Sequence, residues 1–418
     1  MDRTPFYEQV RDRLIRYAQV DTQSARRSDT VPTTKKQFDL AYMLRDELVK
    51  IGAAEVWLDE EKCVLYAAVP STAAPGKGVA FGLVTHMDTA PDAPGANCRP
   101  WVLEGYDGGD ILLNRAQGIT MSPRDFPNLK HYVGQDLILT DGTTLLGGDD
   151  KAAIAAVMTM AEHLLTHPEI PHGRIALGFT PDEEVGGLGK DLDLARFGAK
   201  VAYTVDGDYL GYYMDETFNA SHATVTFEGR SVHTGTAKGI LVNAADMAAA
   251  FVRNLPRREK PELTEGREGF FHVVSIQGDV EHARVDLIIR DHDADRFAQR
   301  EQLLRDLTEK MRKRHGHDRV DLTIIPTYRN MKEVIDRYPF LVDHLRSAIT
   351  MAGLTPRSLP FRGGTDGSAL SHRGLPCPNL SAGYENAHGR FEYVPIPSME
   401  KNVEILLHLA RLFGEMEA

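Results

Sequence analysis

Short apolar runs alternate with segments of helical periodicity along the first half of the chain. Four of these runs predict buried strands, at residues 64–69, 78–85, 174–180 and 201–205. Apolar residues at helical spacing predict helices over 38–51, which ends at Gly52, and over 151–165. Residues 90–145 are rich in Gly, Pro, Asp and Asn and predict loops with short strands. This alternation indicates an α/β sheet with helices on both faces.

The pattern changes after Phe218. Four strand-like runs follow, at residues 222–227, 271–276, 284–289 and 320–325, with helices over 243–252 and 295–313. In chain order this is βαββαβ, the ferredoxin-like arrangement. Beyond residue 330 the chain predicts a helix over 341–351, a short strand at 379–380 and a final helix over 399–413. We therefore expect one α/β domain in two parts, 1–217 and 329–418, interrupted by an inserted domain at 218–328.

Composition narrows the class of protein. The 418 residues include 60 acidic and 48 basic side chains, a formal net charge of -12, which argues against nucleic acid or an anionic membrane as a partner. No apolar stretch is long enough to span a membrane, and Glu8 and Asp12 lie where a secretory signal would be apolar. The cysteines are few and lack any CxxC spacing, at positions 63, 98 and 377. They predict a reducing compartment, and we expect a cytoplasmic enzyme without thiolate zinc sites.

The first candidate metal-binding residues lie at the end of the apolar run 78–85. His86 and Asp88 follow it directly, and in open α/β sheets ligands bind beyond the carboxyl ends of strands. A histidine can bind a metal through one ring nitrogen while a carboxylate orients the other nitrogen. The alternative is an ordinary histidine at a strand end beside a capping aspartate.

Two acidic clusters also lie at the ends of predicted elements, one before a helix and one after a strand. Asp149 and Asp150 precede the helix 151–165, where one of them could simply cap the helix. Glu183 and Glu184, with Asp182 before them, follow the strand 174–180. Adjacent carboxylates repel one another unless cations or protons lie among them, so a solvated acidic loop explains this cluster less well than a metal site does.

Two further residues complete the pattern. Asp206 follows the strand 201–205, and His388 lies near the C-terminus in the sequence NAHG. Histidine and carboxylate ligands without cysteine suit zinc, cobalt or manganese. A carboxylate shared between two ions would make a two-metal site.

Six motifs in order carry a resemblance that spans essentially the whole chain: HMDT, LLGGDDKA, TPDEEVG, TVDG, VHTGTAKG and RGGTDG. With them the sequence resembles the peptidase T family of tripeptide aminopeptidases, within the broader group of cocatalytic two-zinc exopeptidases and deacylases. The resemblance implies a mixed-sheet zinc-exopeptidase catalytic domain with an inserted ferredoxin-like lid and dimerisation domain. The chain departs from the family at Ala387, where the family has an aromatic residue before the last histidine.

The resemblance also implies roles for individual residues. It implies two divalent ions, zinc with cobalt or manganese as substitutes, and five ligands: His86, Asp149, Glu184, Asp206 and His388. Asp149 would bridge the two ions, Asp88 would orient His86, and Glu183 would act as general base. Three further residues would bind the substrate, His233 at the tetrahedral intermediate and Arg290 and Arg362 at its carboxylate.

The activity implied by the resemblance is metal-dependent release of the N-terminal residue from tripeptides by a homodimer. His233 would have to reach the metals by closure of the inserted domain or from a second subunit. A two-metal deacylase or carboxypeptidase would need the same metal ligands, and a non-catalytic peptide- or metal-binding protein would need no Glu183. Ordinary ion pairs are the alternatives for the two arginines, Arg290 with Asp291 and Arg362 with Asp366.

Overall fold

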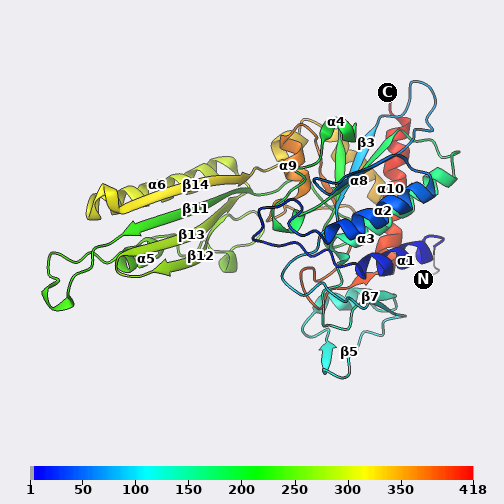
Figure 1. Ribbon diagram of the computed structural model, residues 1–418. Coiled ribbons are helices and arrows are strands. Elements are labelled where there is room, and N and C mark those ends of the chain that lie inside the picture. Colours follow the sequence, from blue (N-terminus) through cyan, green and yellow to red (C-terminus); the bar gives the residue numbers. More distant parts are fainter. Residues whose placement is uncertain (1–3, 418) are drawn as a thin grey trace. The chain divides into compact units, whose positions relative to one another are not determined.

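The protein is described here by a computed structural model of residues 4–417, which divides into two compact units. Unit 1 comprises the chain as far as Asp215, Glu333–Leu359 and the chain from Thr365 on. Unit 2 comprises Glu216–Lys332 together with the short segment Pro360–Gly364. Figure 1 shows the elements of both units.

Unit 1 is built on an eight-stranded mixed sheet with the strand order β1-β2-β8-β3-β9-β16-β10-β15. The strands are β1 (Ala54–Asp59), β2 (Val64–Val69), β3 (Phe81–His86), β8 (Ile175–Thr180), β9 (Ala202–Val205), β10 (Tyr212–Met214), β15 (Arg357–Ser358) and β16 (Asn379–Leu380). The neighbours β8, β3, β9 and β16 run parallel, while β1 with β2, β2 with β8, and β10 with β16 pair antiparallel. The mixed sheet is confirmed.

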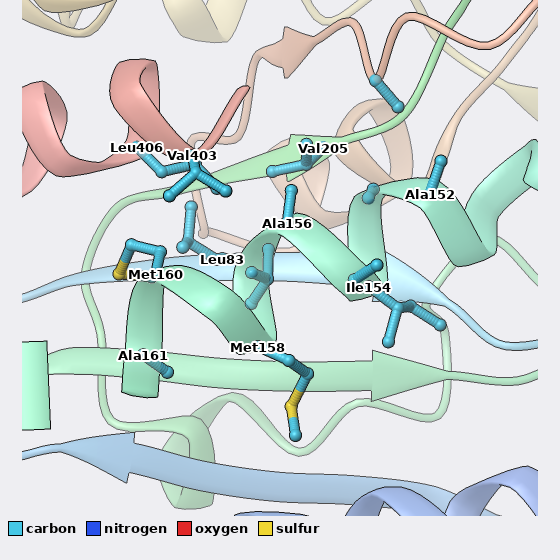
Figure 2. Packing of buried hydrophobic residues seen from close by; sticks show 14 of the residues in the cluster. Leu83, Ala152, Ile154, Ala156, Met158, Met160, Ala161, Val205, Val403 and Leu406 are labelled. Atoms are coloured by element: carbon cyan, nitrogen blue, oxygen red, sulfur yellow. The ribbon is translucent and has the colours of Figure 1, made fainter. Parts of the chain in front are cut away.

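Helices cover both faces of this sheet, as expected. They are α1 (Tyr7–Ala18), α2 (Gln37–Ile51), α3 (Gly148–Thr166), α4 (Leu194–Phe197), α8 (Pro339–Met351), α9 (Asp366–His372) and α10 (Ile396–Glu415). The short helix α7 (Lys332–Ile335) lies in the chain where unit 2 ends and unit 1 resumes. The Ala-rich α3 is buried along most of its length, and Figure 2 shows Ala156 packed with Val205 and Val403. On the other face, Phe197 and Leu370 pack with residues of the sheet.

Residues 90–145 form short strands, as expected: β4 (Trp101–Leu103), β5 (Ile111–Asn114), β6 (Ile119–Met121) and β7 (Leu137–Leu139), the last paired with β17 (Val394–Pro395).

Helix α10 begins three residues before its predicted start. Pro397 lies in its first turn, where the backbone N–H that proline lacks needs no partner. None of the helices within residues 4–417 has the length and apolar character that a membrane crossing requires.

Unit 2 has the predicted βαββαβ order. Its elements are β11 (Asn219–Glu228), α5 (Ala244–Arg253), β12 (Phe270–Gly278), β13 (His282–Asp291), α6 (Ala294–His315) and β14 (Val320–Tyr328). The strands pair antiparallel in the order β12-β13-β11-β14, which is ferredoxin-like. Phe227, Phe251 and Leu304 lie in a core separate from that of unit 1. The segment Pro360–Gly364 joins through Phe361 N–H donating to Glu216 O (3.0 Å) and Phe218 N–H donating to Gly363 O (3.2 Å).

Candidate metal centre

The candidate residues converge because three neighbouring parallel strands end at one edge of the sheet. His86 is the last residue of β3, Thr180 ends β8, and Asp206 follows directly after β9. Strand β3 lies between the other two and is parallel to both. Their carboxyl ends therefore deliver side chains from distant parts of the sequence to one place, the usual ligand position in such sheets.

Asp149 joins them from the start of α3. Its backbone and that of Asp150 are not helical, and the residue that caps the helix is Gly147, without a side-chain hydrogen bond. The capping alternative for these aspartates is therefore wrong. The Asp149 carboxylate lies between two imidazoles instead, with Oδ1 3.0 Å from His86 Nε2 and Oδ2 3.2 Å from His388 Nε2.

Two groups of possible metal ligands share Asp149. One contains His86, Asp149, Asp150 and Asp206, and the other contains Asp149, Glu184 and His388. In each group the nearest ligand atoms lie within 4.8 Å of one another. This arrangement brings together all five predicted ligands and adds Asp150.

The charges of this cluster are poorly balanced by the protein itself. The Glu184 side chain is 4% exposed; one of its oxygens lies 2.9 Å from His388 Nε2, and the other has no hydrogen-bond partner. Burial and the nearby Asp149 raise the pKa of Glu184 to about 7. The same two carboxylates raise the pKa of His388 to about 11. Closely spaced buried carboxylates and imidazoles of this kind are the ligands that divalent cations bind in proteins.

A short 3₁₀ helix, Glu183–Val185, holds the two adjacent glutamates. The fully buried carboxylate of Asp88 accepts hydrogen bonds from the backbone N–H groups of Glu183 (2.9 Å) and Glu184 (3.3 Å). Asp88 also faces His86, with Oδ1 3.4 Å and the backbone carbonyl 3.1 Å from Nδ1. Burial raises the pKa of Glu183 well above its ordinary value, so its carboxyl is poised to hold a proton.

Two residues that bind the candidate ligands were not predicted from the sequence, Glu392 and Tyr384. The carboxylate of Glu392 accepts the backbone N–H groups of Leu146 (3.0 Å), Gly147 (2.7 Å) and Asp149 (2.9 Å) and so fixes the turn before α3. The hydroxyl of Tyr384 donates to Asp206 at 2.7 Å. No local sequence pattern marks either residue as a support of the site.

The three predicted substrate-binding residues all lie in unit 2. His233 is exposed, and its Nδ1 accepts the N–H of Gly235 at 3.2 Å. Arg290, at the end of β13, donates to the carbonyl of Ile289 at 2.9 Å and lies over the ring of Tyr328. In place of the alternative pairing of Arg290 with Asp291, the carboxylate of Asp291 is bound by Arg300 at 2.8 Å.

Arg362 is held by a loop of its own unit. Its guanidinium donates to the carbonyls of Gly266 (2.9 Å) and Glu268 (2.8 Å) and to the hydroxyl of Thr264 (2.8 Å). The alternative pairing with Asp366 is wrong, since Asp366 is buried and accepts a hydrogen bond from Thr180 at 2.6 Å.

Comparison with known proteins places this geometry among peptidases. The family model described as "Peptidase dimerisation domain" matches residues 216–319. Peptidase T of Geobacillus kaustophilus is 47% identical over 408 residues, covering 98% of this chain and 99% of the relative. Peptidase T of Clostridium botulinum (strain Okra / Type B1) is 46% identical over 405 residues, covering 97% of this chain and 99% of the relative.

Solved structures share the fold. Aminopeptidase PepT from Bacillus cereus superposes with a TM-score of 0.76 at 22% identity, covering 97% of this chain and 98% of that one. A tripeptidase from Staphylococcus aureus gives a TM-score of 0.77 at 21% identity, covering 98% of this chain and 99% of that one. A dinuclear metal-binding peptidase of the M20 family from Bacillus subtilis gives 0.67 at 10% identity, with 97% and 98% covered.

Proposed function

The chain belongs to the peptidase T family, and we propose that it is a metal-dependent aminopeptidase that releases the N-terminal residue from tripeptides. The observation that carries the chemistry is the sharing of Asp149 between two ligand groups, with Glu183 directly beside the ligand Glu184. A centre of this kind suits attack of water on a peptide carbonyl. Membership of the family supports the tripeptide as substrate.

The residues present fit two divalent cations. His86 and Asp206 would hold one ion, Glu184 and His388 the other, and Asp149 both. The unpartnered oxygens of Asp150 and Glu184 are buried acceptors of the kind that a cation satisfies. Nitrogen and oxygen donors without sulfur suit zinc, and cobalt or manganese as substitutes. When bound, the ions polarise the peptide carbonyl and make water acidic enough to attack near neutral pH.

The protein's own groups then divide the remaining work. Glu183 takes the proton of the attacking water and passes it to the leaving amine, for which its raised pKa is suited. Asp88 keeps the imidazole of His86 in one orientation. His233, Arg290 and Arg362 stay predictions as substrate-binding residues, with the first stabilising the oxyanion and the arginines binding the substrate carboxylate.

Other observations support the assembly and the location. A homodimer is supported by the match of residues 216–319 to a peptidase dimerisation domain. The domain limits 1–217, 218–328 and 329–418 are kept as our proposal. A cytoplasmic location is supported by three buried cysteines without disulfides, Cys63, Cys98 and Cys377. The net charge of -12 argues against nucleic acid and an anionic membrane as partners. Membership of the family supports a short peptide as the substrate.

The test is an assay of purified protein with zinc, cobalt or manganese against di-, tri- and tetrapeptides and N-acetyl amino acids. We expect selective cleavage of tripeptides at the N-terminal bond, lost on chelation and restored by metal. Cleavage of N-acetyl amino acids alone would overturn the substrate assignment. Activity that survives complete metal removal would overturn the mechanism.

A further inference from the structure

The turn that carries Glu183 is also held by two residues near the N-terminus, Thr33 and Gln37. Asp182, the residue before Glu183, is 4% exposed and has a left-handed backbone with φ of 62°. Its carboxylate accepts hydrogen bonds from the N–H (2.8 Å) and hydroxyl (2.5 Å) of Thr33 and from the Nε2 of Gln37 (2.7 Å). Three donors therefore converge on one buried carboxylate.

Gln37 contacts the backbone of the same residue. Its Oε1 accepts the N–H of Asp182 at 3.3 Å. One side-chain amide therefore binds both the backbone N–H and the carboxylate of Asp182. The left-handed backbone of Asp182 is uncommon outside glycine and is tolerated best by residues such as aspartate and asparagine. The turn then closes through the carbonyl of Asp182, which accepts the N–H of Gly187 at 2.7 Å.

Gln37 is itself fixed by the core of unit 1. It is fully buried and is the first residue of α2, a helix whose apolar face is buried at Leu40, Leu44 and Leu48. A side chain at the end of a packed helix has little freedom to move. The packed helix α2 therefore fixes Asp182 through Gln37, and Asp182 in turn limits the backbone position of the next residue, Glu183.

We propose that Asp182, Gln37 and Thr33 are positioning residues that set the direction of the Glu183 carboxylate independently of metal binding, an inference that rests on the proposed function. Asp88 holds the backbone of Glu183 from the side of His86, and Gln37 holds the residue before it. In the two ligand groups, neither Gln37 nor Thr33 nor Asp182 contributes an atom. A proton acceptor works only when it lies within hydrogen-bond reach of its water, so its direction matters as much as its pKa.

The first test is Gln37→Leu in the metal-loaded full chain, because leucine keeps the buried volume but loses both contacts with Asp182. We expect kcat for a tripeptide to fall by roughly 10- to 100-fold, with KM and the bound metal content nearly unchanged. Gln23→Leu is the matched control: Gln23 is another glutamine of the same region, whose Nε2 donates to the carbonyls of Ala90 and Ala93. An unchanged kcat in Gln37→Leu, or an equal fall in both variants, would overturn the proposal.

A double-mutant cycle separates positioning from general stability. In a Glu183→Gln background, Gln37→Leu should lower the residual rate no further, because the group that it directs is already lost. An equal fold-loss in both backgrounds would show that Gln37 acts by another route.

Crystal structures of the metal-loaded protein supply a measurement that needs no turnover. We expect Gln37→Leu to shift or disorder the Glu183 side chain while His86, Asp149 and Glu184 stay in place. A Glu183 side chain unchanged in direction would contradict the inference even if the protein turned out to act on another substrate. A protein inactive on every substrate, with Glu183 displaced in the variant, would instead contradict the proposed function alone.

Discussion

The carboxylate of Asp88 binds the backbone N–H of Glu183 at 2.9 Å. The same carboxylate faces the imidazole of His86. One buried side chain therefore connects the end of β3, which supplies a candidate metal ligand, to the turn that supplies the candidate base. Metal affinity and proton transfer should both depend on it.

Replacement of Asp88 tests this double role. We expect Asp88→Ala to weaken metal binding by about 10- to 100-fold, the usual effect of losing the partner of a metal-bound histidine. It should also lower kcat at saturating metal, because the N–H groups of Glu183 and Glu184 lose their acceptor. Metal titration and steady-state kinetics measure the two effects separately. Asp88→Ala with normal kcat at saturating metal would mean that the contact with Glu183 is unimportant.

The two adjacent glutamates should respond differently to the same change. Glu183→Gln should retain both metal ions and lower kcat by roughly 10²- to 10⁴-fold, since an amide cannot shuttle the proton. Glu184→Gln should lose metal, because it removes a charged ligand from the second group. Elemental analysis of the purified variants, beside their rates, distinguishes the two. Loss of metal in Glu183→Gln would show that the roles are exchanged.

His292 makes unit 2 sensitive to acid. Burial lowers the pKa of His292 to about 4. Its ring packs at a tilt against the ring of Phe218, and its Nε2 donates to the carbonyl of Phe361. The unfolded chain takes up this proton near pH 6.5 and the folded chain only near pH 4. This group therefore costs no stability above pH 6.5 and lowers the free energy of unfolding as pH falls towards 4, by at most about 1.4 kcal/mol per pH unit.

The measurement is urea unfolding at several pH values, compared between the wild type and His292→Phe. Phenylalanine keeps a ring beside Phe218 and cannot take up a proton. We expect the variant to be less stable at pH 7.5, because it loses the contact with Phe361, but to lose less stability between pH 6.5 and 4. Equal pH slopes in the two proteins would exclude His292 as the source.

Arg362 should have a structural effect that needs no substrate. Its guanidinium holds residues 264, 266 and 268, so Arg362→Ala should loosen this loop in the free protein. Hydrogen exchange of residues 264–268 should become faster, whereas Arg290→Ala, whose hydrogen bonds go to strand carbonyls, should leave that loop unchanged. Unchanged exchange in Arg362→Ala would leave substrate binding as its main role.

Local patterns were sufficient to predict the sheet edge and the fold of unit 2. The apolar run before His86 and the one before Asp206 each end in a polar side chain, and the rule for parallel strands brings such ends together. In unit 2 the alternating runs around Val225 and Val285 report burial of one face directly.

Contacts between distant loops left no such signal. Glu392 reaches Asp149 across 243 positions, and Gln37 reaches Asp182 across 145. Nothing in the periodicity near these residues marks the contacts, because one polar residue at the start of a helix or in a loop has the same local appearance whether it is solvated or buried. For the same reason the partners of Arg362 were not predicted, since the loop 264–268 has no repeating pattern.

The composition of unit 2 has a consequence for protein engineering. Because Pro360–Gly364 belongs to this unit and is tied to Glu216 and Phe218 by backbone hydrogen bonds, the unit is not encoded by one contiguous stretch. A chimera that takes only residues 216–332 from a relative would combine them with the original segment Pro360–Gly364. This combination would disturb both hydrogen bonds. A chimera between members of the family should therefore take both segments of unit 2, Glu216–Lys332 and Pro360–Gly364, from the same parent.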